Sequence, residues 1–209
     1  MSKPFFSVIV PAHNSQQYIW KCLHSVRMQK FEDYELIVVC DDCTDKTAEV
    51  AIGYADRVIT TQYGMDGLAR NAGLDAAEGK WILFLDDDDW WIHEYVMKAI
   101  YDRLAIYDQF DMIIFDFIWK DVGYVNNYAQ RMNIACWSKC YRREFIGDTR
   151  FPAIPMTSDE PFIQEIIAKK PRCLTLNMLM YYYNYMRKGS QTEIHARPEG
   201  ADPEQQVER

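Results

Sequence analysis

The chain has 209 residues, of which 49% are hydrophobic and 14% aromatic, and its formal net charge is -8. This composition excludes an intrinsically disordered protein, and the length suffices for one domain with a sizeable core. The net negative charge argues against a nucleic-acid-binding surface, and no apolar stretch reaches the roughly 18 residues that a membrane-spanning helix needs.

Strands and helices are predicted to alternate through the first half of the chain. Short, β-branched or aromatic apolar runs predict strands at 5–10, 35–40, 57–61 and 81–85. Apolar residues that recur every three or four positions predict helices at 15–29 and 92–107. A cap at Thr44 or Asp45 predicts a helix at 44–54, and a run of small residues predicts one at 67–77. This alternation predicts an α/β fold with a doubly wound, mostly parallel, Rossmann-like sheet.

The alternation ends after residue 110, and a small mixed C-terminal part is expected there. Its predicted elements are strands at 111–118, 173–176 and 180–185, a loop at 121–131 and a helix at 161–168. We therefore expect one domain over 1–195, in two halves (1–110 and 111–195). Residues 196–209 are polar, carry two prolines and lack aromatics, so they are expected to be a disordered tail.

Four consecutive aspartates, Asp86 to Asp89, follow the predicted strand at 81–85. Adjacent carboxylates repel one another, and hard cations such as Mn²⁺ and Mg²⁺ prefer carboxylate oxygens. Ligands of open α/β sheets bind at the carboxyl ends of the strands. The run therefore predicts a divalent-metal site, with a solvated acidic turn as the alternative.

Polar residues follow two other predicted strands as well, in the segment 11–14 and at Asp41 and Asp42. In a doubly wound sheet these loops lie beside the aspartate run and together can hold a nucleoside diphosphate. The sequence contains no G-x-G-x-x-G and no Walker-type motif, so phosphate binding is expected to depend on the metal. For Asp41, capping of the following helix is the preferred interpretation.

Six segments along the chain carry a family resemblance. In order they are SVIVPAHN, ELIVVCDDCTDKT, GLARNAGLDAAEGKWILFLDDDDWW, ACWSKCYRREF, TSDEPFI and YYYNYMRKGSQT. Together they span roughly 5–192, and they resemble the family 2 glycosyltransferases, which have the glycosyltransferase A fold. The resemblance implies a nucleotide-binding half at 1–110 and an acceptor-side half at 111–195.

The resemblance also implies which residues contact the donor. Pro11, Ala12 and His13 match the loop that lies along the nucleotide base. Asp42 matches the aspartate that contacts the base, although Cys43 stands where glycine is usual. Arg70 matches an arginine near the nucleotide.

Asp86, Asp88 and Asp89 match the family's D-x-D motif, which holds the ribose and the divalent metal on the donor diphosphate. This assignment makes Asp86, Asp88 and Asp89 the expected ligands of Mn²⁺ or Mg²⁺, and it groups Asp86 and Asp87 with the donor-binding residues.

Asp159 matches the second residue of the family's Glu-Asp-x-x-Phe string, judged by its spacing to Phe162, and is the expected general base. Because Ser158 replaces the glutamate of that string, Glu160 remains a competitor. The implied reaction moves a sugar from a nucleotide sugar, most often a UDP-sugar, to an acceptor hydroxyl with inversion at the anomeric carbon.

The family's usual setting implies a carbohydrate or lipid-linked acceptor and a part in surface polysaccharide synthesis. A cytoplasmic location is expected, with peripheral membrane association left open. The sequence ends soon after Ser190, so a minimal enzyme and a fragment are both open.

Alternatives remain for the whole chain and for single residues. Asp86 also fits the nucleophile of an aspartyl-phosphate phosphohydrolase, and a non-catalytic nucleotide-binding relative is a third interpretation. His13 can stack on a base or pack behind the sheet. Arg70 can merely pair with Asp66 or Asp75, and Lys139 is expected to be exposed.

Overall fold

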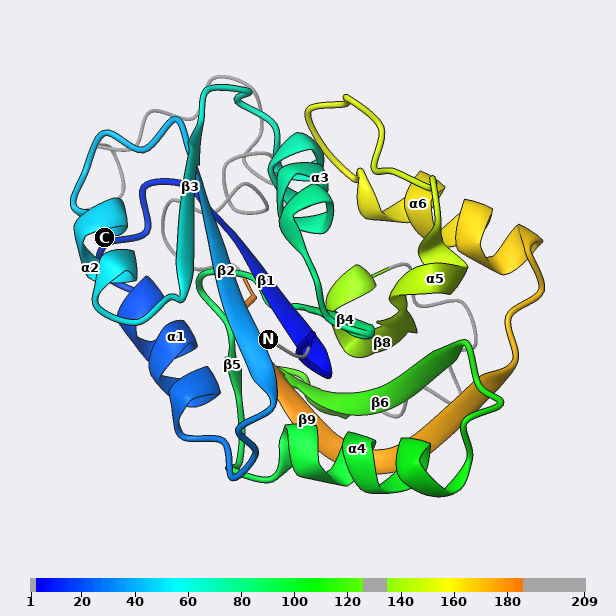
Figure 1. The fold of residues 1–209 in the computed structure, drawn as a ribbon. Helices are drawn as coiled ribbons and strands as arrows, with labels where there is room; N and C mark the ends of the chain where they lie inside the picture. The colour runs from blue at the N-terminus through cyan, green and yellow to red at the C-terminus, as the bar shows by residue number, and fades with distance from the viewer. Residues whose placement is uncertain (1–2, 126–134, 186–209) are drawn as a thin grey trace.

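A computed structural model describes residues 3–125 and 135–185. They form a nine-stranded mixed sheet in the order β3-β2-β1-β4-β8-β6-β9-β5, with β7 paired to β6 (Figure 1). The strands are β1 (Phe6–Ala12), β2 (Tyr34–Asp41), β3 (Arg57–Thr61), β4 (Trp81–Phe84), β5 (Trp90–Trp91), β6 (Met112–Trp119), β7 (Gly123–Val125), β8 (Lys139–Arg142) and β9 (Cys173–Tyr183). The helices are α1 (Ile19–Arg27), α2 (Thr47–Ile52), α3 (Asp66–Ala76), α4 (Val96–Ile106), α5 (Arg143–Ile146) and α6 (Asp159–Ala168), and η1 (Cys136–Ser138) is a 3₁₀ turn.

The first half has the predicted alternation. Strands β3, β2, β1 and β4 are neighbours and run parallel. Helices α1 and α2 lie on one side of these strands and α3 on the other (Figure 1). Since both faces are covered, every residue of β1 is buried, which explains why all of its residues except Ser7 are apolar.

The first helix begins later than predicted. It runs over Ile19–Arg27, because the residues before it form hydrogen bonds with the loop after β2 and with the first residue of α2. The backbone N–H of Ser15 donates to Thr47 Oγ1 at 2.7 Å, and Asn14 Oδ1 accepts from the N–H of Thr44 at 2.8 Å. The spacing of apolar residues along a helix does not predict tertiary hydrogen bonds of this kind.

The second half departs further from the prediction. The strand β8 was not predicted, yet it lies antiparallel between β4 and β6 and so joins both halves into one sheet. The two strands expected at 173–176 and 180–185 are one strand, β9, whose pairing with β6 shifts register near Asp116. Residues 123–125 of the predicted loop form β7, whereas 126–131 and the predicted tail at 196–209 lie outside the described residues.

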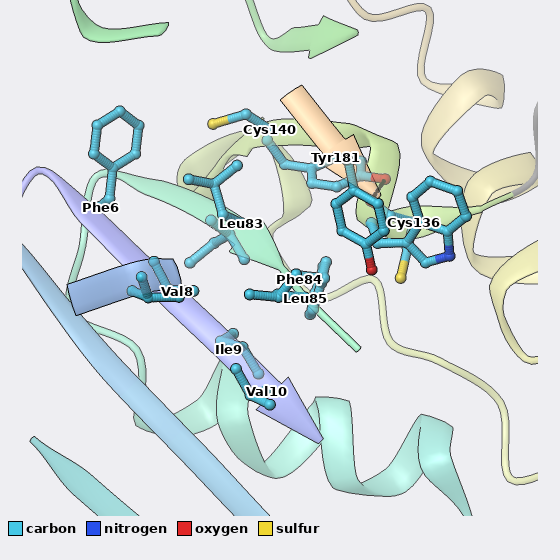
Figure 2. Packing of buried hydrophobic residues seen from close by; sticks show 14 of the residues in the cluster. Phe6, Val8, Ile9, Val10, Leu83, Phe84, Leu85, Cys136, Cys140 and Tyr181 are labelled. Atoms are coloured by element: carbon cyan, nitrogen blue, oxygen red, sulfur yellow. Dashed lines mark hydrogen bonds between the residues drawn. The ribbon is translucent and has the colours of Figure 1, made fainter. Parts of the chain in front are cut away.

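The core lies where β1 meets β4. Figure 2 shows the aliphatic side chains of β1 against Leu83, Phe84 and Leu85, with Cys136 and Tyr181 at the border toward the second half. All of these side chains are fully buried. The loops after β1 and β4 therefore emerge from a fully buried part of the core.

Substitution of Gly79 tests how closely the entry to β4 packs against β1. A Cβ at Gly79 would lie 2.5 Å from Ser7 N and 2.6 Å from Phe6 C, both backbone atoms that cannot rotate away. We expect Gly79→Ala to lower the free energy of unfolding by about 1–3 kcal/mol, measured by denaturant titration. The control is Gly53→Ala, where the nearest atom is 3.4 Å away, and an equal loss in both variants would contradict this packing argument.

Candidate active site at the carboxyl ends of the parallel strands

The loops after β1, β2 and β4 meet at one edge of the sheet, as predicted. The backbone N–H of His13 donates to Asp87 Oδ2 at 3.0 Å, which connects the β1 and β4 loops. The Nδ1–H of the His13 ring donates to the carbonyl of Asp41 at 2.7 Å, which connects the β1 and β2 loops. The ring is exposed, so the alternative that it packs behind the sheet is wrong. Pro11 and Ala12, just before it, are buried at the end of β1.

The two aspartates after β2 have different surroundings. Asp41 is buried and accepts from Thr61 Oγ1 at 2.8 Å and from the N–H groups of Tyr63 and Met65 at 2.7 and 3.0 Å. It therefore shapes the segment before α3, and its predicted role as a cap of α2 is wrong. Asp42, which directly follows β2, has a φ of 49° and is half-buried beside Gly64.

The four consecutive aspartates do not form a solvated turn, because Asp87 and Asp89 are buried. Both oxygens of Asp89 accept hydrogen bonds, from Tyr181 Oη at 2.6 Å and from the N–H of Asn184 at 2.7 Å. Asp89 thereby ties the loop after β4 to the end of β9. Asp86 and Asp88 are half-buried and lie nearer the surface of the loop.

The surroundings of Asp86 fit a bound cation. Burial, together with the Asp159 and Asp88 carboxylates, raises the pKa of Asp86 to about 6, although Arg70 opposes this shift. Within 3–125 and 135–185, no three His, Cys, Asp or Glu side chains form a ready-made metal cluster. A cation that binds through one or two carboxylates plus phosphate oxygens of a ligand needs no such cluster, so Asp86 and Asp88 suit it.

Arg70 is the cation at the centre of the site. It is 4% exposed, and its guanidinium contacts Asp66, Asp86 Oδ1 at 2.8 Å and Asp159 Oδ1 at 3.5 Å. Burial alone would lower its pKa, but the three carboxylates hold the pKa of Arg70 well above its ordinary value. Of the two acids in the alternative interpretation of Arg70, Asp66 does pair with it, whereas Asp75 pairs with Arg150.

The structure separates the two candidates for the general base. Asp159 is the first residue of α6 and lies against Arg70, with the N–H of Cys136 donating to its Oδ2 at 2.8 Å. Glu160 accepts from Gln164 one turn further along the helix, on an exposed face. Asp159 thus joins the cluster of Arg70 and Asp86, and Glu160 does not.

Sequence reasoning missed three contributors to the site. Tyr181 Oη, on β9, donates to Asp89 Oδ2 and accepts from the N–H of Asp86. The N–H of Cys136, in η1, donates to Asp159 Oδ2. Lys139, expected to be exposed, is 4% exposed. A clue existed for Tyr181, because alternation along a strand puts Tyr181 and Tyr183 on one face, where both stack on Trp137.

The comparison with protein families decides the assignment. The model described as Glycosyl transferase family 2 matches residues 7–159, which include the loops after β1, β2 and β4 and reach Asp159. The chain belongs to glycosyl transferase family 2. The match leaves the phosphohydrolase alternative without support.

Solved structures agree with this fold. S. aureus TarS (residues 1–349, in complex with UDP-GlcNAc) superposes with a TM-score of 0.81 at 26% identity, over 90% of this chain and 60% of that one. The mannosyltransferase PcManGT from Pyrobaculum calidifontis, in complex with GDP-Man and Mn²⁺, has a TM-score of 0.72 at 16% identity over 90% of this chain and 59% of that one, and supports the fold alone. Both confirm the α/β, Rossmann-like architecture of glycosyltransferase A proteins.

Among curated relatives, the putative glycosyltransferase EpsH of Bacillus subtilis is 34% identical over 191 residues, which cover 79% of this chain and 54% of EpsH. Glycosyltransferase GlyA of Streptococcus pneumoniae is 26% identical, over 90% of this chain and 31% of GlyA. The chain thus spans only a third to a half of these relatives. No helix of the described segments is long and apolar enough to cross a membrane.

Removal of Arg70 tests the central ion pairs. Arg70→Met leaves three carboxylates without their shared cation, and we expect the free energy of unfolding to fall by about 3 kcal/mol, the low end for a buried pair because the acids are partly exposed. In the control Lys98→Met an exposed pair with Asp102 is lost, and a change of about 0–1 kcal/mol is expected. Urea titration of both variants measures the difference, and similar losses would refute the special role of Arg70.

Proposed function

We propose that this chain is the catalytic domain of an inverting glycosyltransferase that moves a sugar from a UDP-sugar to an acceptor hydroxyl with the help of a divalent cation. The observation that carries the proposal is the arrangement in which Arg70 contacts both Asp86, from the loop after β4, and Asp159, from the start of α6. It brings a carboxylate that we assign to the donor diphosphate and a candidate general base to the same buried guanidinium.

The donor is proposed to bind across the loops after β1, β2 and β4. The exposed ring of His13 and the carboxylate of Asp42 are proposed to contact the nucleotide base, since both lie at the strand ends where nucleotides bind in such sheets. A uridine nucleotide is favoured because the TarS structure that superposes on 90% of this chain contains UDP-GlcNAc.

The cation is assigned to Asp86 and Asp88. Asp89 is left out, because it is fully buried and both of its oxygens already accept protein hydrogen bonds. When bound, Mn²⁺ or Mg²⁺ would supply positive charge for the departing diphosphate. Asp87 contributes indirectly, since its carboxylate holds the backbone of His13 in the donor loop.

Asp159 is proposed to accept the proton of the acceptor hydroxyl. Its Oδ2 accepts from the N–H of Cys136, whereas Oδ1 forms an ion pair with Arg70 at 3.5 Å, and we assign the proton transfer to Oδ1. A single carboxylate base that activates the acceptor implies direct displacement at the anomeric carbon and hence inversion. The acceptor is proposed to be a carbohydrate or a lipid-linked glycan of a surface polysaccharide, reached from the cytoplasm or at the membrane surface.

The first test concerns donor binding. We expect UDP to bind in the presence of Mn²⁺ and more weakly without it, and Asp88→Asn to lose at least tenfold in affinity (about 1.4 kcal/mol) together with the dependence on Mn²⁺. Isothermal titration calorimetry measures both. The control is Asp102→Asn, an exposed aspartate on α4 paired with Lys98. Metal-independent binding, or no binding, would contradict the proposed donor site.

The second test separates the candidate base from its neighbour. Asp159→Asn is expected to lower kcat for UDP-sugar turnover by about 10²–10⁴-fold, because the variant has no carboxylate to take the proton, while UDP still binds. Glu160→Gln is the matched control and should keep wild-type turnover. If wild type binds UDP but turns over no UDP-sugar from a panel, the chain is a non-catalytic nucleotide-binding relative.

A further inference from the structure

A buried lysine lies behind the candidate base, in a place where an uncharged residue would be the ordinary choice. Lys139, the first residue of β8, is 4% exposed, and its Nζ donates to the carbonyl of Ala135 at 2.8 Å and to Ser138 Oγ at 3.1 Å. Burying an ammonium group costs free energy unless the group is hydrogen-bonded and its charge is compensated. Burial lowers the pKa of Lys139 to about 8, which still leaves the amine mostly protonated at neutral pH.

The carbonyl that Lys139 contacts belongs to the same peptide group as the N–H that holds Asp159. Ala135 O accepts from Lys139, and Cys136 N donates to Asp159 Oδ2 at 2.8 Å. A cationic donor at the oxygen of a peptide group draws electron density from the nitrogen and makes its N–H a stronger donor. Lys139 and Asp159 are thus linked through one polarised peptide group.

A second side chain of β8 holds the same turn. The hydroxyl of Tyr141 donates to the carbonyl of Cys136 at 3.0 Å, so successive carbonyls of η1 and its entry are fixed from one strand. Lys139 and Tyr141 are two residues apart and therefore point to the same face of β8. On that face the ring of Tyr141 packs against Phe162 of α6, the helix that begins with Asp159.

We infer that Lys139 is a positioning residue for Asp159: through the Ala135–Cys136 peptide group it fixes one carboxylate oxygen of the base and leaves the other turned toward the site. Lys139 contacts neither donor nor acceptor in this role. The inference rests on the proposed function, because it gives Asp159 the task of the base.

The kinetic test uses Lys139→Met, which keeps the apolar length of the side chain and removes its charge and donors. We expect kcat to fall about 10–100-fold, as for a reacting group that loses its alignment, with KM for the UDP-sugar and affinity for UDP unchanged. Lys139→Arg, which keeps charge and donors, should restore most of kcat. Lys98→Met, an exposed lysine on α4, is the control and should behave as wild type.

A spectroscopic test does not depend on turnover. In ¹⁵N-labelled protein, the amide proton of Cys136 should resonate upfield in Lys139→Met relative to wild type, because the polarised bond to Asp159 weakens. Tyr141→Phe, which removes only the contact to Cys136 O, keeps the charge and should cause a smaller shift. If Lys139→Met fails to fold, Lys139→Gln replaces it in both tests.

The outcomes separate this inference from the proposed function. Normal kcat in Lys139→Met, or an unshifted Cys136 amide signal, overturns the role of Lys139, while an inactive Asp159→Asn keeps Asp159 as the base. Full activity of Asp159→Asn would instead remove the proposed base, whatever Lys139 does. A rise in KM with unchanged kcat would make Lys139 part of substrate binding and would also overturn the inference.

Discussion

The site depends on one buried cation shared among carboxylates from three segments. Arg70 of α3 contacts Asp66 in its own helix, Asp86 in the loop after β4 and Asp159 at the start of α6. Without the guanidinium these acids would repel one another in a partly desolvated place. With it, burial and the carboxylates of Asp159 and Asp88 still raise the pKa of Asp86, so a second cation is suited to the loop.

The fold brings together the segments that contact Arg70. The parallel strands β2, β1 and β4 end side by side, so their loops meet without long connections. Strand β8 then attaches the second half to β4, and with it come η1 and α6, which deliver Cys136 and Asp159 to the same edge. The nucleotide side and the acceptor side of the proposed reaction are therefore parts of one continuous sheet (Figure 1).

The consecutive aspartates illustrate how one sequence pattern divides into different tasks. Asp87 holds the donor loop through His13, and Asp89 anchors the loop to β9, whereas Asp86 and Asp88 remain half-buried at its surface. Neighbouring residues in an extended turn point in different directions, so identical side chains meet different partners. A run of aspartates thus predicts a charged site, and the backbone conformation decides which of these aspartates can bind a ligand.

The sequence by itself determined the parallel first half and the loops that carry the site, because apolar period and strand-end polarity are local properties. It also predicted Asp159 as the candidate base through its resemblance to a family. Only the tertiary structure decided that Arg70 joins Asp86 to Asp159, that β8 is a strand and that Lys139 is buried. These features come from contacts between segments far apart in the chain, and the local sequence pattern does not predict such contacts.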